Sequence, residues 1–235
     1  MSQLPVLMYH NVCSDNANSR GLTISAEKLE EQFAYLSKKG YTTYHLAELE
    51  GIDPLPAKGV VITYDDITEN QLRHAVPLLE KYNLKATFFI PFAYIGKTDQ
   101  WNGGAEKIMS ISQLQGLNPD VVELGYHSYL HRKYADMNDT EIKEDFENCH
   151  RIILETRLAV YPAVAYPYGN YPKQEPAKTH FKKLLADNGI KTAFRIGNRV
   201  NQFPFKDNYE VQRIDVKGEW SLFKFRLMLK FGKLL

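Results

Sequence analysis

The sequence is poor in cysteine and in long apolar runs, and it carries no excess of charge of either sign. Its two cysteines, Cys13 and Cys149, are too few and too far apart in sequence to define a disulfide framework or a cysteine-based metal site. No stretch reaches the ~20 apolar residues of a membrane-spanning helix. The formal net charge is +1 and the basic residues are spread along the chain, so there is no electrostatic footprint for nucleic acid.

A signal peptide is also missing from the start of the sequence. Residues 1–5 lead directly into the first expected strand, without the basic segment and long apolar stretch of such a peptide. We therefore expect a cytoplasmic protein. At 235 residues, 44% of them hydrophobic, the chain is long enough for one domain with a large core, and we expect a single domain over residues 1–235.

Short apolar strands alternate with amphipathic helices, which is typical of a parallel α/β sheet or barrel. In the first helix, Leu29, Phe33 and Leu36 recur at helical spacing. Ser25 is a suitable N-cap before them, and Gly40 closes the helix.

Later segments repeat this alternation. The expected core stripes and strands are, in order, Leu72, Val76 and Leu79, then strand 85–90, then Ile142, Phe146, Ile153 and Leu154, then strand 162–165, then Phe181, Leu184 and Leu185, then strand 191–194. Pro77 lies within the first of these stripes, so that helix must be kinked or begin late.

Chemistry-bearing residues follow two of the apolar runs. Asp65 and Asp66 come at the end of the run 59–64, and His127 and His131 follow the run 121–126. Because adjacent strand residues point to opposite faces, both carboxylates can share a pocket only where the strand turns into a loop. The carboxyl ends of strands are where barrels and doubly wound folds collect their reactive groups.

A divalent ion held by Asp66, His127 and His131 would keep coordination positions open for water. Such an ion lowers the pKa of its water from ~15.7 to about 7, and the second carboxylate can then act as general base. Two plainer interpretations stay open here. The Asp pair could cap a helix that begins near residue 68, and histidines four residues apart could be solvated surface groups.

These residues resemble two motifs of the polysaccharide deacetylases, also called carbohydrate esterase family 4 or the NodB-homology domain. Thr63-Tyr64-Asp65-Asp66 is similar to the family's T-F-D-D-G motif, and the segment from His127 to His131 is similar to H-[ST]-x-x-H. The resemblance implies a distorted (β/α) barrel of about seven strands. It also implies that Asp65 is the general base and that Asp66, His127 and His131 bind the metal.

Two more segments extend the resemblance over residues 5 to about 215. Tyr166-Pro167-Tyr168-Gly169 resembles the motif R-P-P-[FY]-G, which implies that the Tyr168 N–H binds the oxyanion; a simple Pro-Tyr-Gly turn is the alternative. Leu7-Met8-Tyr9-His10-Asn11-Val12 is similar to the start of a circularly permuted branch that includes the poly-N-acetylglucosamine deacetylases. That similarity implies that His10 is the general acid.

The sequence departs from the family pattern in two places. Ile67 stands where the family has glycine, and a β-branched residue there resists positive φ and is expected to add bulk beside the metal. The arginine that would orient Asp65 is missing, because residues 164–166 are Val, Ala and Tyr. Both departures favour an alternative, a catalytically inactive carbohydrate-binding or scaffold relative.

The resemblance nevertheless implies a metal-dependent hydrolase that removes the N-acetyl group from an N-acetylated sugar. We expect one divalent ion, zinc ahead of iron, cobalt, nickel or manganese. For a cytoplasmic enzyme, a precursor or lipid-linked glycan of surface polysaccharide biosynthesis is the expected substrate. An amidohydrolase acting on a non-sugar amide is a further alternative, because function lives in the site rather than in the fold.

Two segments have interpretations that the sequence leaves open. Trp101, in the long connection 91–109, could stack on a sugar ring or pack under its own loop. Residues 219–235 interleave basic and large apolar side chains, as a C-terminal amphipathic helix does. That helix could make peripheral membrane contact, or it could pack its apolar side on its own domain.

Overall fold

The strands of this protein form a closed parallel barrel. A computed structural model describes residues 2–233. Seven strands pair in parallel and close through β2 and β6, as the sequence predicts. In spatial order they are β2 (Val6–Tyr9), β12 (Val211–Asp215), β10 (Thr192–Ile196), β9 (Val160–Ala165), β8 (Val122–Tyr126), β7 (Ala86–Ile90) and β6 (Gly59–Asp65).

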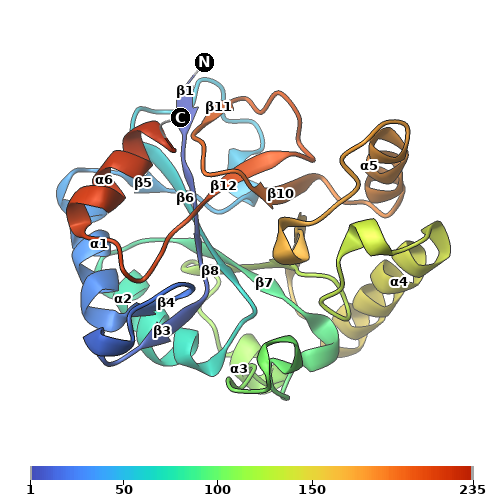
Figure 1. The fold of residues 1–235 in the computed structure, drawn as a ribbon, viewed down its shortest axis with the longest axis horizontal. Coiled ribbons are helices and arrows are strands. Elements are labelled where there is room, and N and C mark those ends of the chain that lie inside the picture. Colours follow the sequence, from blue (N-terminus) through green and yellow to red (C-terminus); the bar gives the residue numbers. More distant parts are fainter. Residues whose placement is uncertain (1, 234–235) are drawn as a thin grey trace.

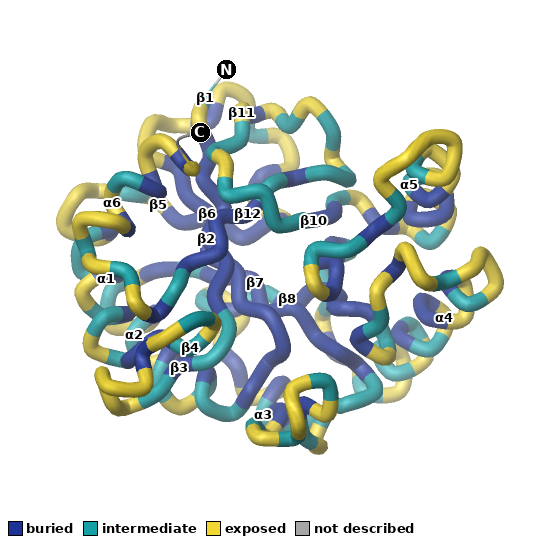
Figure 2. The backbone as a smooth tube through the Cα atoms, in the orientation of Figure 1, coloured by how far each residue is buried: buried dark blue, intermediate teal, exposed yellow. Residues whose placement is uncertain are grey.

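Helices and short strand pairs surround this barrel (Figure 1). The helices are α1 (Ala26–Lys38), α2 (Val76–Lys81), α3 (Ile111–Gln115), α4 (Asp139–Thr156), α5 (Ala177–Asp187) and α6 (Leu222–Phe231). Outside the ring, β5 (Thr42–Thr43) pairs with β6, β1 (Ser2–Leu4) with β11 (Asn201–Phe203), and β3 (Asn11–Cys13) with β4 (Thr23–Ser25). Strands β2, β6 and β7 are buried along their whole length, and the outer faces of the helices are exposed (Figure 2).

Helix α1 forms as its sequence predicts. The Ser25 hydroxyl accepts a hydrogen bond from the N–H of Lys28 and satisfies one of the free donors of the first turn. Leu29, Phe33 and Leu36 are buried on one face. Gly40 follows the helix with a φ of 68°, a left-handed conformation that glycine adopts without a steric penalty.

The helix that contains Pro77 begins late. A π-helical turn, Gln71–Ala75, precedes α2, and Pro77 is the second residue of α2, where a missing N–H is tolerated. The π-helical turn includes Gln71, whose side chain is fully buried. Such turns often occur at functional sites.

Two details of the predicted helices are wrong. Leu154 lies in α4 but is 78% exposed, because it falls on the solvent side of the helix rather than in its core stripe. The C-terminal helix spans residues 222–231 rather than 219–235, because Ser221 caps its start and Gly232 ends it; residues 234 and 235 lie outside the described part. Its inner side packs on the domain through Phe225, and its contact with a membrane stays a prediction.

Within residues 2–233, none of the helices has both the length and the apolar character needed to span a bilayer.

The barrel brings one end of all seven strands together. In the pairing of β2 with β6, Tyr9 lies opposite Tyr64, so His10 and Asp65 are the next residues along the two chains. Strand β8 ends immediately before His127, and β9 ends at Ala165, shortly before Tyr168. The predicted site residues therefore meet at the carboxyl end of the barrel, where such folds place their chemistry.

The close approach of β7 and β8 can be tested at Gly125. A Cβ at this position would lie 2.7 Å from the ring of Phe89 and 3.1 Å from the carbonyl oxygen of Ala163. We expect Gly125→Ala to lower the free energy of unfolding by about 1–3 kcal/mol, as overpacking does. Gly116→Ala is the control, because Gly116 has a φ of −83° and the nearest atom to an added Cβ is 3.4 Å away. Equal urea midpoints for both variants would contradict this packing.

Candidate metal and catalytic centre

Asp66, His127 and His131 form a compact set of metal-ligand atoms. One donor atom from each lies within 4.8 Å of the others, and all three residues are buried. The Nε2 atoms of the two histidines are 3.5 Å and 3.4 Å from the same Asp66 oxygen, Oδ1. Two imidazoles and one carboxylate make a set that suits zinc and several other divalent ions. The residues therefore fit the ion that the sequence predicts.

His127 is held in the form that a metal ion requires. Its Nδ1 lies 2.8 Å from the carbonyl oxygen of Ala165, so Nδ1 carries the proton and Nε2 faces the other ligands. Burial lowers the pKa of His127 to about 4, although the charges of Asp65 and Asp66 oppose this shift. The imidazole is therefore neutral at pH 7, and its Nε2 lone pair is available for coordination.

Asp65 makes a buried ion pair with Arg213. The guanidinium donates from one nitrogen to each carboxylate oxygen, at 2.6 Å and 2.7 Å, and both side chains are almost fully buried. Burial raises the pKa of Asp65, but the charge of Arg213 outweighs it and holds the pKa well below its usual range. Asp65 is therefore an anion near neutral pH, and the bidentate contact with Arg213 fixes its orientation.

Arg213 is the orienting arginine that the motif around Tyr166 lacks. It comes from β12, 148 residues after Asp65, and its charge also lies 5.6 Å from the centre of the Phe89 ring. Arg213 could not be identified from sequence, because it stands in an ordinary alternating strand, Val211–Asp215, with no motif around it. Only the closure of the barrel brings β12 to within one strand of β6.

His10 lies beside this ion pair. Its Nε2 is 3.6 Å from Oδ2 of Asp65, and its side chain is 13% exposed, which leaves it accessible from the cavity. The buried amide of Gln71 joins the two strand ends by donating to the carbonyl oxygens of His10, at 3.0 Å, and Asp65, at 2.6 Å. Gln71, another residue that the sequence analysis did not identify, thus fixes the predicted acid and base relative to each other.

Ile67 does not crowd the metal ligands, contrary to the expectation from sequence. Its φ is 47°, an unusual conformation for a β-branched residue, and its side chain is fully buried in the hydrophobic core. Asp66, Ser128, His131 and Tyr168 also have positive φ. Among residues 2–233, five of the nine non-glycine residues with positive φ thus belong to the site motifs, and backbone strain of this kind concentrates at functional sites.

All six predicted site residues line one cavity of about 610 Å³. They are His10, Asp65, Asp66, His127, His131 and Tyr168. Tyr168 is half-exposed at the cavity, and the centre of its ring is 4.8 Å from that of His131. The arrangement places a carboxylate base, an imidazole and a set of metal ligands around one cavity. Metal-assisted hydrolysis uses these three kinds of group.

Asp145 anchors the loop between the two histidines. This carboxyl lies on α4 and accepts hydrogen bonds from the N–H of Tyr129, at 2.8 Å, and from the hydroxyl of Tyr134, at 3.1 Å. Burial raises the pKa of Asp145 to about 6, despite these two donors. The conformation of the loop from His127 to His131 therefore depends on a titratable group that is not itself a ligand.

Comparison with known families gives a match over more than half of the chain. The family model described as "Polysaccharide deacetylase" matches residues 53–181. The chain is 24% identical over 177 residues to the Bacillus subtilis protein YxkH. The aligned residues make up 74% of this chain and 59% of YxkH. It is 22% identical over 231 residues to the poly-beta-1,6-N-acetyl-D-glucosamine N-deacetylase of Staphylococcus epidermidis, which covers 92% of this chain and 75% of the relative.

The same fold occurs in solved structures. The Streptococcus pyogenes deacetylase PplD, solved in complex with acetate, superimposes with a TM-score of 0.78 over 97% of this chain and 98% of PplD. The two sequences are 20% identical, so this likeness concerns the fold. The circular permutation expected from residues 7–12 stays a prediction.

The Asp145 anchor generates a pH-dependent prediction. Because the pKa of Asp145 is near 6 when folded and about 3.9 when unfolded, its contribution to stability falls as pH rises from about 4 to 6 and is constant above that. We expect Asp145→Asn, which keeps an oxygen for the Tyr129 N–H, to remove this dependence. Urea unfolding at pH 4.5 and pH 7 gives the free energy of unfolding of the wild type and of Asp145→Asn, and the difference between the two proteins at each pH measures the contribution of Asp145. A difference that is the same at both pH values would contradict the prediction.

Proposed function

This chain belongs to the polysaccharide deacetylase family, and from that premise we propose that it is a metal-dependent hydrolase that removes the N-acetyl group from an N-acetylated sugar. The observation that carries the proposal is the different environment of its two adjacent carboxylates. Asp65 is bound by Arg213, whereas Oδ1 of Asp66 faces the Nε2 atoms of His127 and His131. One carboxylate is thereby suited to proton transfer and the other to metal binding.

The proposed reaction needs one ion and three protein groups. Asp66, His127 and His131 would hold the ion, which when bound would polarise the acetamide carbonyl and lower the pKa of water to about 7. Asp65 accepts a proton from the attacking water while Arg213 keeps its carboxylate in place. The N–H of Tyr168 donates to the developing oxyanion. His10 gives a proton to the departing nitrogen, so the C–N bond breaks and acetate and a free amine are released.

The sugar substrate is proposed from the relatives. The Staphylococcus epidermidis relative is named for poly-beta-1,6-N-acetyl-D-glucosamine, which supports an N-acetylated glycan for this chain. The half-exposed ring of Tyr168 lines the cavity, and such a ring suits the apolar face of a sugar. We further propose that the glycan is a precursor or a lipid-linked chain of surface polysaccharide biosynthesis, and that zinc is the ion.

The two departures that favoured an inactive relative have counterparts in the structure. Arg213 occupies the role of the missing arginine, and Ile67 adopts positive φ with its side chain in the core. Neither departure therefore argues against turnover. The alternative, hydrolysis of a non-sugar amide, differs from the proposal in which substrate releases acetate.

The proposed base can be tested by acetate release from N-acetylglucosamine oligomers. We expect Asp65→Asn to lower kcat by about 10² to 10⁴, the usual contribution of a general base, because the amide cannot accept the proton. Asp136→Asn is the matched control, since Asp136 is an exposed residue of a short helical turn that does not line the cavity. Acetate release by Asp65→Asn at the wild-type rate would contradict the role of Asp65. Release from simple acetamides but not from the sugars would favour the non-sugar amidohydrolase.

Arg213→Lys tests the orienting contact. Lysine keeps the positive charge but cannot bind both oxygens of Asp65 in one plane. We expect kcat/KM at pH 7 to fall on the order of 10²-fold, as for a misplaced reacting group. The pKa of Asp65 should rise towards its usual value, which moves the acid limb of the pH profile to higher pH. Arg151→Lys, at an exposed position of α4, is the control, and a variant pH profile identical to the wild type would overturn the assignment.

A further inference from the structure

We infer that Trp101 is a positioning residue for the metal ligand His131, which it holds in place by ring stacking rather than by a hydrogen bond. The inference rests on the proposed function, because it takes His131 as a ligand. It assigns Trp101 a role that differs from the two interpretations left open by the sequence, which were stacking on a sugar ring and packing under its own loop.

The two histidines differ in how their second nitrogen is held. Nδ1 of His127 donates to the carbonyl oxygen of Ala165, which is the common way to orient a ligating imidazole. Nδ1 of His131 is buried, and among residues 2–233 no hydrogen-bond partner lies within reach of it. Its Nε2 nevertheless lies 3.4 Å from Asp66, in position to share an ion. Something other than a hydrogen bond must therefore fix the plane of this ring.

Aromatic rings enclose His131 instead. The Trp101 ring lies flat on the imidazole, with centres 4.1 Å apart and planes 18° apart. Tyr168 meets the imidazole edge-on at 4.8 Å and 71°, and His127 does so at 4.8 Å and 68°. Rotation of the imidazole about its Cβ–Cγ bond would push its edge into the indole. The stacked pair thus fixes the plane of the imidazole, and in this plane Nε2 lies 3.4 Å from Asp66.

Trp101 is itself held by a braced loop. Tyr94 contacts its ring edge-on, with centres 4.8 Å apart. Asp99, which is buried and precedes Trp101 in the loop, accepts hydrogen bonds from two residues that follow it, from the side-chain amide of Asn102 at 3.0 Å and from the N–H of Glu106 at 2.8 Å. Contacts within its own loop therefore place the indole.

This loop is also joined to the chain that follows Asp66. The N–H of Met109 donates to the carbonyl oxygen of Ile67 at 2.9 Å, and the N–H of Glu69 donates to that of Lys107 at 2.7 Å. The segment carrying the ligand carboxylate and the loop carrying Trp101 are thus one hydrogen-bonded unit. Through Trp101, this unit sets the position of the imidazole relative to the carboxylate.

The test compares Trp101→Leu with Trp101→Phe. Leucine fills part of the space without a flat ring, whereas phenylalanine can still stack on the imidazole. We expect Trp101→Leu to weaken Zn²⁺ binding about 10- to 100-fold, the usual effect of losing a group that orients a ligand. Trp101→Phe should restore most of the affinity. Zn²⁺ affinity is measured by competition with a chromogenic chelator, and the unfolding temperature of each metal-free variant shows that it is folded.

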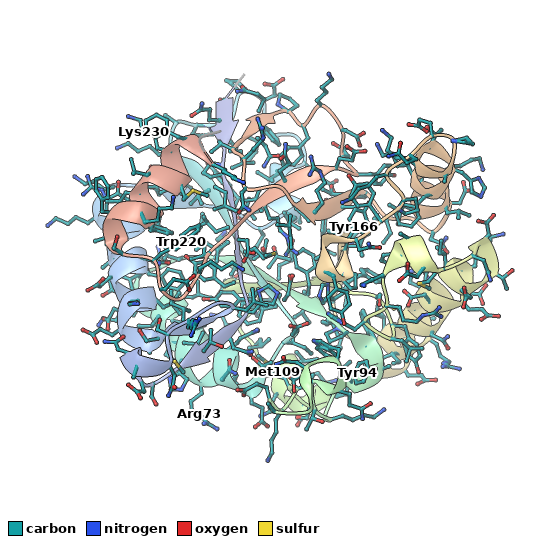
Figure 3. All side chains as sticks on the ribbon, viewed as in Figure 1. Arg73, Tyr94, Met109, Tyr166, Trp220 and Lys230 are labelled. Carbon is teal, nitrogen blue, oxygen red and sulfur yellow. The ribbon has the colours of Figure 1, made fainter. Side chains whose placement is uncertain are left out.

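A spectroscopic readout separates positioning from a loss of stability. Co²⁺ bound at the site should quench the emission of Trp101, which stacks on a ligand. Trp220 is the other tryptophan of the chain; it does not line the cavity, and it lies across the barrel from Tyr94, the neighbour of Trp101 (Figure 3). We expect quenching to persist in Trp220→Phe and to be lost in Trp101→Phe. The visible absorption of bound Co²⁺ should change in Trp101→Leu, because the imidazole is no longer held in one orientation.

The outcomes separate the two ideas. Wild-type affinity and an unchanged Co²⁺ spectrum in Trp101→Leu would overturn the positioning role while leaving the metal site in place. An absence of metal binding by the wild-type protein would overturn both. Equal losses of affinity in the leucine and phenylalanine variants would show that the volume of the indole, rather than its stacking, matters, and would also overturn the inference.

Discussion

The buried ion pair between Asp65 and Arg213 is the interaction on which the site depends. Two adjacent carboxylates facing two imidazoles could otherwise bind an ion in more than one way. Arg213 takes both oxygens of Asp65 and leaves Oδ1 of Asp66 facing the histidines. A buried pair of this kind contributes little net stability but costs about 3–5 kcal/mol to break, so it fixes one arrangement. The different roles proposed for the two carboxylates, proton transfer for Asp65 and metal binding for Asp66, follow from this contact.

The closed barrel makes this contact available. Arg213 and Asp65 belong to β12 and β6, the two neighbours of β2, and their side chains meet only because the seven strands close into a ring. The same closure places His10, at the end of β2, beside Asp65. The residues just after the strands then adopt strained backbone conformations, which turn the ligands towards one point. The barrel therefore fixes where the site residues begin, and the loop backbone fixes where their side chains point.

Much of the site could be predicted from sequence because its motifs lie directly after apolar strands. Asp65, Asp66, His127 and His131 share short motifs, and parallel strands carry such motifs to one end of a barrel. Arg213 could not be found this way, because it lies 148 residues from its partner and looks like any charged residue of an alternating strand. The fit of Ile67 also depended on tertiary packing, since the core that receives its side chain is built from distant segments.

We propose that Asp66 binds the ion and that Asp65 does not. The most direct test is the metal content of the purified wild-type protein beside Asp65→Asn and Asp66→Asn, which are isosteric changes at adjacent positions. We predict one divalent ion per chain in the wild type and in Asp65→Asn, and none in Asp66→Asn. Loss of the ion from both variants alike, or no ion in the wild type, would contradict the account.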